Sequence, residues 1–158
     1  EPGKGSVFRI YLPVAERMAV DAAPRTELPI RGGDELILLA EDEDMVRDFT
    51  ARVLEGAGYR VLTARNGEDA LALLRDNPQA VDLMLLDVVM PKLGGRLAYE
   101  QAQKIRADIP VLFASGYTEN AIHANFVLEK GLKLIQKPFS HEGLLRLVRE
   151  TLDERKRT

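Results

Sequence analysis

The sequence predicts an α/β fold in which an open parallel sheet of five strands is covered by helices on both faces. From Glu35 onward, short apolar runs alternate with amphipathic segments of helical period, at about 20–25 residues per unit. One of these runs, within residues 82–91, ends abruptly at Asp87, which is typical of a buried parallel strand that carries a polar residue to its C-terminal end. Alternation of this kind favours right-handed strand–helix–strand crossovers.

The elements of the first half follow from local patterns. Residues 36–40 form an apolar strand, and the next segment is helical, with apolar positions at Met45, Val46, Phe49, Val53 and Leu54 before the glycines at 56 and 58. Residues 59–64 predict a second strand, and the turn at 66–67 leads into a helix that ends before Pro78. Residues 81–86 predict the third and central strand.

The second half continues the same alternation. A glycine turn at 94–95 precedes a helix to about residue 107, and residues 111–114 predict a fourth strand. Thr118 can cap a helix to about Lys130, and residues 132–136 predict the fifth strand. Ser140 can cap a last helix whose apolar face carries Leu144, Leu145, Val148 and Leu152.

Composition excludes several classes of function. The chain has 158 residues, with 22 basic and 25 acidic residues and a net charge of -3. It therefore lacks the excess of basic residues that is typical of proteins that bind nucleic acid. It has no apolar run of membrane-spanning length and no signal peptide, and we expect a soluble, cytoplasmic protein without membrane contact. The absence of cysteine excludes disulfides and thiolate chemistry. Because the sequence begins at Glu1 rather than methionine, we expect a piece of a longer protein.

Polar side chains stand at the ends of four predicted strands: Glu41, Asp42, Asp87, Ser115 and Lys137. The C-terminal ends of parallel strands share one edge, so we expect these residues to converge. Carboxylates within ~4–6 Å of one another are unfavourable unless a cation neutralises them. Mg²⁺ would do so, and the lysine and serine could then bind a phosphoryl group. Taken alone, Asp87 could instead cap a turn.

Four separated motifs in the segment 34–158 together match the pattern of one known domain family. They are the acidic pair 41–42, Asp-x-x-Met-Pro at 87–91, Ala-Ser-Gly at 114–116 and Lys-Pro-Phe at 137–139. In these motifs the segment resembles a response-regulator receiver domain. The resemblance implies a flavodoxin-like (βα)5 three-layer sandwich with strand order 2-1-3-4-5.

The resemblance also implies roles for single residues. Asp87 would accept a phosphoryl group from phosphohistidine, Ser115 would be the switch hydroxyl and Lys137 the salt-bridging lysine. The Mg²⁺ ligands would be Glu41, Asp42, Asp87 and the backbone carbonyl of Val89. Glu41 stands where aspartate is more common, and Leu134 stands where a switch aromatic is common, which puts coupling through aromatic burial in doubt.

The N-terminal residues extend the resemblance. Gly3-Lys4-Gly5-Ser6-Val7-Phe8 leads into a strand pattern that ends at Leu12-Pro13, and it resembles the last glycine box of a histidine-kinase ATPase domain. Residues 1–13 would then be the end of such a domain, without nucleotide binding of its own, and residues 14–33 a linker rich in proline and glycine. The parent protein would be a hybrid histidine kinase that can be membrane-anchored. The receiver would promote its own phosphorylation and dephosphorylation without being a stand-alone enzyme.

The implied partners are the histidine kinase core, a histidine phosphotransfer protein, or both, and a homodimer through the helix 4–strand 5–helix 5 face stays open. Two alternative functions are weighed against this one. A phosphohydrolase with an aspartate nucleophile needs a second aspartate two residues further on, where this chain has Val89. A non-phosphorylated interaction module would keep only the fold, and would not need Asp42, Asp87, Ser115 and Lys137 together.

Overall fold

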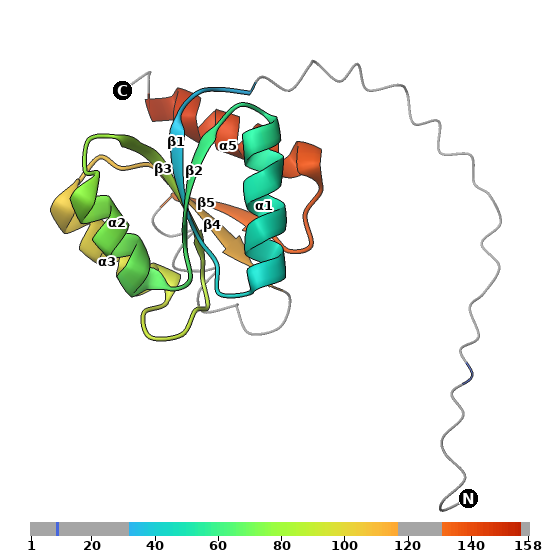
Figure 1. Cartoon of the computed structure of the whole chain (residues 1–158), viewed down its shortest axis with the longest axis horizontal. Helices are drawn as coiled ribbons and strands as arrows, with labels where there is room; N and C mark the ends of the chain where they lie inside the picture. Colours follow the sequence, from blue (N-terminus) through green and yellow to red (C-terminus); the bar gives the residue numbers. More distant parts are fainter. Residues whose placement is uncertain (1–8, 10–31, 117–130, 156–158) are drawn as a thin grey trace, which may run out of the picture.

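The computed structural model of the chain describes Arg9, residues 32–116 and residues 131–155. Within them, five strands form one parallel sheet (Figure 1): β1 (Leu36–Ala40), β2 (Arg60–Ala64), β3 (Val81–Asp87), β4 (Val111–Ser115) and β5 (Lys133–Gln136). Their order across the sheet is β2-β1-β3-β4-β5. The predicted parallel sheet and the strand order implied by the resemblance are confirmed.

Four predicted helices lie within the described residues: α1 (Asp44–Gly56), α2 (Gly67–Asp76), α3 (Gly95–Ile105) and α5 (His141–Arg155). Side-chain caps fix the start of two of them. The Asn66 side chain accepts a hydrogen bond from the Asp69 amide at 3.0 Å, and the Ser140 hydroxyl accepts one from the Gly143 amide at 3.1 Å, as predicted. The helix predicted at 118–130, the ATPase-like residues except Arg9, and the linker up to residue 31 lie outside the described residues.

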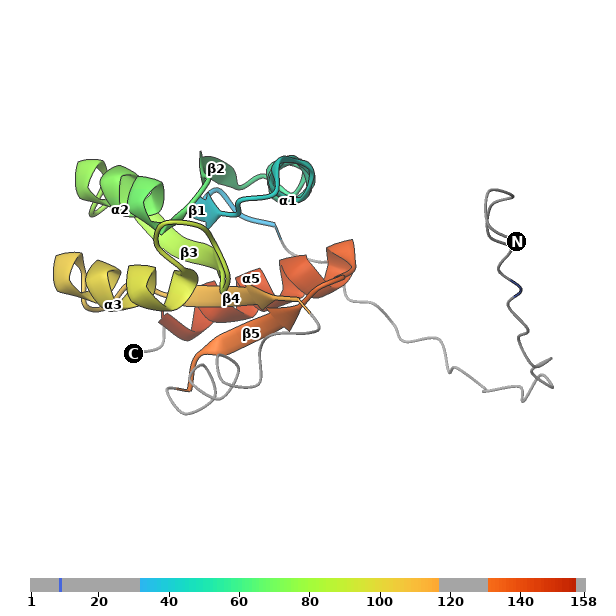
Figure 2. The same cartoon turned by 90° about the horizontal axis from the view of Figure 1, so that it is seen from below.

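The described helices cover the sheet in two layers. Helices α2 and α3 lie on one face, and α1 and α5 lie on the other (Figure 2). The strand side chains alternate between the two cores, because successive residues of a strand point to opposite faces. Thus Leu38 and Met84 pack under α2 and α3, whereas Ile37 and Leu85 pack under α1 and α5.

The side of helix α1 that packs on the sheet differs from the one that its apolar residues predict. Its buried residues are Arg47, Thr50, Ala51 and Leu54. Two of the apolar residues that indicated this helix point away from the core, since Met45 is 80% exposed and Phe49 is 47% exposed. The sheet-facing side is therefore partly polar, and part of the apolar side of α1 faces outward.

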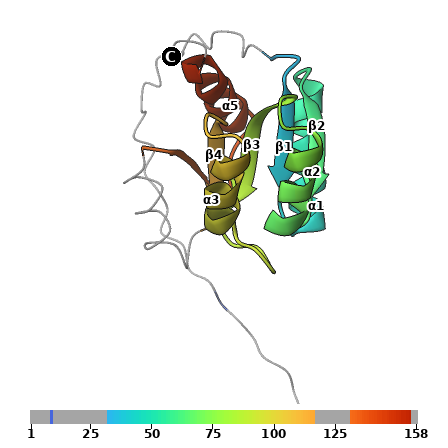
Figure 3. The ribbon, with the colours of Figure 1, turned by 90° about the vertical axis from the view of Figure 1, so that its left-hand side faces the viewer.

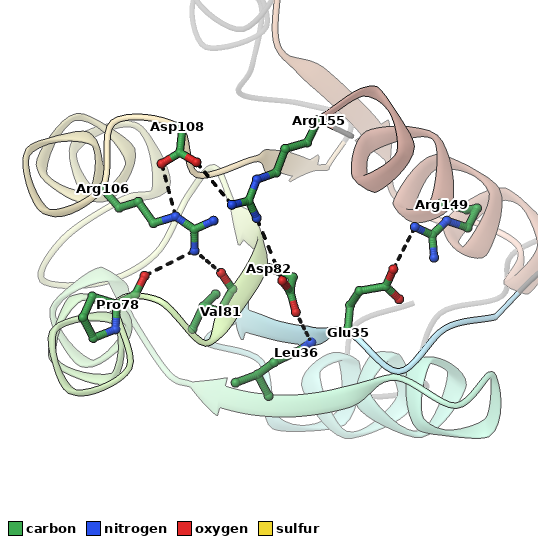
Figure 4. A network of polar contacts seen from close by, with 9 residues as sticks. All are labelled: Glu35, Leu36, Pro78, Val81, Asp82, Arg106, Asp108, Arg149 and Arg155. Atoms are coloured by element: carbon green, nitrogen blue, oxygen red, sulfur yellow. Dashed lines mark hydrogen bonds and ion pairs between the residues drawn. The ribbon is translucent and has the colours of Figure 1, made fainter. Parts of the chain in front are cut away.

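A polar network ties the helices to the edge where the strands begin (Figure 4). Arg106, only 6% exposed, donates to the main-chain carbonyl of Pro78 at 3.2 Å and to that of Val81. Arg155 near the end of α5 pairs with Asp108 at 3.2 Å and lies 3.9 Å from Asp82. Figure 3 shows β1 and β3 running away from this end of α5, so the network lies opposite the edge at which the strands end.

Candidate functional site

The register of the sheet brings the predicted site residues to one edge. Ala40 of β1 pairs with Leu86 of β3, and Ser115 of β4 pairs with Gln136 of β5. The residues that follow β1, end β3 and β4, and follow β5 therefore lie at the C-terminal edge of the sheet: Glu41, Asp42, Asp87, Ser115 and Lys137. The convergence expected from the sequence is present in the structure.

Lys137 pairs with two carboxylates at the centre of this edge. Its Nζ lies 2.7 Å from Oδ2 of Asp87 and also contacts Oε2 of Glu41. The three side chains are largely buried, with exposed fractions of 19% for Lys137, 12% for Asp87 and 4% for Glu41. Charge-assisted hydrogen bonds of this kind are stronger than neutral ones, so Lys137 fixes both carboxylates.

The acidic side chains form a cluster that can hold a cation. Glu41, Asp42 and Asp87 each offer one carboxylate oxygen, and these oxygens all lie within 4.8 Å of one another. With all four groups ionised, three carboxylates and one lysine leave a formal charge of -3 + 1 = -2, which a divalent cation would balance. An all-oxygen donor set suits a hard cation such as Mg²⁺. The residues present therefore fit a magnesium ion.

Burial and charge shift the ionisation of two groups in this cluster. Burial raises the pKa of Glu41 above its ordinary value, the hydrogen bond from Lys137 opposes this rise, and the charge of Asp87 adds to it. Burial alone would lower the pKa of Lys137, but its hydrogen bonds to Asp87 and Glu41 outweigh that effect and raise the pKa. Lys137 therefore stays a cation at neutral pH.

The loop after β3 folds closely over Asp87. The Val89 amide donates to Oδ1 of Asp87 at 3.2 Å, which places the main chain of Val89 beside the carboxylate. Gly95 then lies against the same strand end, because a Cβ at this position would be 2.2 Å from the Asp87 carbonyl oxygen. Only glycine fits here without a shift of the backbone.

Ser115 is joined to Lys137 through the main chain. The carbonyl of Ser115 accepts a hydrogen bond from the Lys137 amide at 2.7 Å. The Ser115 side chain is buried, and its hydroxyl donates to the Gly116 carbonyl at 3.3 Å. This hydrogen bond joins the strand end that carries Ser115 to the residue that follows β5.

Arg47 is a supporting residue that sequence reasoning missed. Its guanidinium donates to the main-chain carbonyl of Glu41 at 2.9 Å and pairs with Asp44. It therefore holds the turn that carries Glu41 and Asp42. The spacing 47, 50, 51, 54 is that of one helix face, but its first two members, Arg47 and Thr50, are polar, so an apolar pattern could not reveal it.

Comparison with known proteins gives consistent matches. A family model described as the response regulator receiver domain matches residues 37–149. The sensor kinase CckA of Brucella abortus (strain 2308) is 35% identical over 98% of this chain, which spans 17% of the length of that kinase. The response regulator receiver protein CpdR of the same organism is 33% identical, and the match covers 73% of this chain and 95% of CpdR.

Solved structures agree with these matches. The receiver domain from the hybrid histidine kinase CckA is 33% identical with a TM-score of 0.63, over 74% of this chain and 98% of that domain. A CheY-like response regulator receiver domain protein from Methanospirillum hungatei JF-1 is 29% identical with a TM-score of 0.70, over 79% of this chain and 98% of that protein. Within the described ranges, no helix has the length and apolar character needed to cross a membrane.

Proposed function

Because the chain belongs to the response regulator receiver domain family of two-component signalling, we propose that it accepts a phosphoryl group from a phosphohistidine onto Asp87. An oxygen of the Asp87 carboxylate attacks phosphorus, the bond from phosphorus to the imidazole nitrogen breaks, and the electron pair stays with the imidazole. The products are an aspartyl phosphate on this chain and a free histidine on the donor.

The observation that carries this proposal is the position of Asp87. Its carboxylate stands at the end of the central strand, 2.7 Å from Lys137 and among the oxygens of Glu41 and Asp42. Phosphoryl transfer depends mainly on positioning and on neutralising charge. Lys137 would pair with one oxygen of the phosphorylated side chain, and the Ser115 hydroxyl would bind another after a local shift.

The acidic cluster would hold Mg²⁺ for this reaction. The proposed ligands are the carboxylates of Glu41, Asp42 and Asp87 together with the backbone carbonyl of Val89. When bound, Mg²⁺ would supply the positive charge that lets an anionic phosphoryl group approach three carboxylates. Arg47 would keep the Glu41–Asp42 turn in place while this happens.

The wider context proposed for this domain is a hybrid histidine kinase. The match to CckA covers 98% of this chain, whereas the family model covers only residues 37–149, so the likeness to that kinase extends beyond the receiver. Residues 1–13, which resemble the end of a kinase ATPase domain, support the same origin. The partners would be the kinase core or a histidine phosphotransfer protein, in the cytoplasm.

Phosphorylation by a small-molecule phosphodonor, read by intact mass, tests the proposal. We expect the wild type to gain the mass of one phosphoryl group with Mg²⁺ and to gain much less with a chelator. Asp87→Asn should gain none, whereas Asp48→Asn, which changes an exposed carboxylate on α1, should behave as the wild type. An unchanged gain in Asp87→Asn would refute the assignment. No gain in any folded variant, also with a phosphohistidine donor, would favour a non-phosphorylated interaction module.

A further inference from the structure

The main chain of Glu41, at the acidic edge, is held from two sides. Its amide donates to the carbonyl of Ala64 at 3.1 Å, and its carbonyl accepts a hydrogen bond from Nη1 of Arg47 at 2.9 Å. The first bond continues the pairing of β1 with β2, whereas the second comes from a side chain of α1. The direction in which the main chain leaves Glu41 toward Asp42 therefore depends on Arg47.

The guanidinium of Arg47 is itself fixed in place. Its side chain is only 7% exposed, and its Nη2 pairs with Asp44, the first residue of α1. A planar guanidinium presents its donors in a rigid fork. Two acceptors bound at the same time, the Glu41 carbonyl and the Asp44 carboxylate, therefore fix its orientation.

Asp42 is the carboxylate that depends most on this arrangement. Lys137 pairs with the other two carboxylates of the cluster, those of Glu41 and Asp87. Among the residues that the structure describes, no side-chain hydrogen bond or ion pair holds Asp42, although its carboxylate oxygen lies within 4.8 Å of theirs. The position of the Asp42 carboxylate is thus set by the main chain at residues 41–42, which Arg47 holds.

We propose that Arg47 is a positioning residue for the cation site, because by holding the Glu41 carbonyl it places the Asp42 carboxylate where it can bind a divalent cation. This rests on the magnesium site proposed above, and adds a residue that touches neither the ion nor the phosphoryl group. Groups that orient metal ligands typically contribute about 10–100-fold to metal affinity. The positive charge of Arg47 has the opposite effect, since it repels a second cation. Positioning and charge therefore predict changes of opposite sign.

Mn²⁺ binding to the full chain, without any phosphodonor, tests the proposal. Mn²⁺ prefers oxygen ligands as Mg²⁺ does, and the electron paramagnetic resonance signal of the free ion gives the fraction bound. We expect Arg47→Met to bind Mn²⁺ at least about tenfold more weakly than the wild type. The matched control is Arg149→Met, which removes another largely buried arginine, 16% exposed and 2.9 Å from Glu35 at the opposite edge (Figure 4). It should bind within about twofold of the wild type.

The sign and the site of the change decide the outcome. Unchanged or tighter binding in Arg47→Met would overturn the proposal, because removing the charge alone strengthens cation binding. An equal loss in Arg149→Met would overturn it as well, since general destabilisation would then be the cause. A wild type that binds no Mn²⁺ would overturn the magnesium site itself, whereas binding by the wild type with no loss in Arg47→Met would overturn only the positioning role.

Circular dichroism at the same temperature checks that each variant is folded, because a variant that is about 90% folded loses only about 1.1-fold in apparent affinity. If Arg47→Met does not fold, Arg47→Lys replaces it. Lysine keeps the charge but lacks the guanidinium fork, and we expect binding at least about threefold weaker than in the wild type. Wild-type affinity in this variant would then overturn the proposal.

A double-mutant comparison tests whether Arg47 acts through Asp42. In the Asp42→Asn background, the carboxylate that Arg47 positions is already gone. Adding Arg47→Met should therefore weaken Mn²⁺ binding by less than about twofold. A loss there as large as in the wild-type background would overturn the proposal, because Arg47 would then act on another part of the site.

Discussion

Replacing Lys137 by methionine tests the electrostatic reasoning at the site most directly. The substitution keeps an unbranched side chain but removes the cation that pairs with Glu41 and Asp87. Breaking a fully buried ion pair from one side costs about 3–5 kcal/mol. Because the Lys137 side chain is 19% exposed, we expect a smaller loss, about 2–3 kcal/mol of unfolding free energy at pH 7 without Mg²⁺.

Lys133→Met is the matched control. Lys133 is in β5 and also has two carboxylate partners, Glu150 at 3.8 Å and Glu154 at 2.7 Å. Those partners are 50% and 65% exposed, so this variant should lose less than about 1 kcal/mol. Urea unfolding followed by circular dichroism in a chelating buffer measures both. If the two variants lost the same free energy, the buried cluster would not be the source of the effect.

The pH dependence of the same difference follows from the pKa shifts. The folded-state pKa of Lys137 is raised above 10.5. Its contribution to the free energy of unfolding is therefore complete below about pH 10.5 and is lost as the pH rises through the folded-state pKa. On the acid side, the pKa of Glu41 is raised above 4.5, mainly by burial, so its protonation removes one partner. The difference in unfolding free energy between the wild type and Lys137→Met should be constant near neutral pH. It should become smaller at both acidic and strongly alkaline pH. Saturating Mg²⁺ should shrink it as well, since the ion replaces the missing charge. A difference unaffected by pH and Mg²⁺ would contradict an electrostatic origin.

Three further substitutions test the fold around the site by urea unfolding. Gly95→Ala places a methyl 2.2 Å from the Asp87 carbonyl and should lose more than about 2 kcal/mol, whereas Gly56→Ala, with open space around it, should gain up to about 1 kcal/mol; equal effects would contradict the close contact. Asn66→Ala removes the cap of α2 and should lose about 1 kcal/mol, and an unchanged value would refute the cap. Arg106→Met leaves two main-chain carbonyls without their donor and should lose about 2–4 kcal/mol; a loss below about 0.5 kcal/mol would mean that solvent replaces it.

The parts of the fold that were predictable are those that local pattern encodes. The three inner strands, β1, β3 and β4, are mainly apolar runs because both faces of the sheet are covered there, and each run ends where a polar residue appears. The convergence of Glu41, Asp87 and Lys137 followed from one topological fact, that parallel strands end at the same edge. No distance between them was needed for that inference.

The parts that were not predictable depend on contacts between distant segments. Arg47 is buried because it reaches the carbonyl of Glu41, and an arginine in a helix ordinarily indicates an exposed position. Met45 and Phe49 are outward-facing although they helped to indicate the helix. Likewise, Gly32 and Gly33 belong by sequence to a stretch of linker composition, and their contact with Ala57 has no local signal.

The two ends of the described domain leave it at the same edge, far from the acidic one. Gly33 contacts the end of α1 and Arg149, and Arg155 is bonded near the starts of β3 and β4. A unit of this layout can be spliced into another polypeptide at either junction without a connecting segment crossing in front of Asp87. The acidic edge, with the phosphorylation site proposed at Asp87, would therefore be kept unchanged if recombination moved the domain from one protein to another.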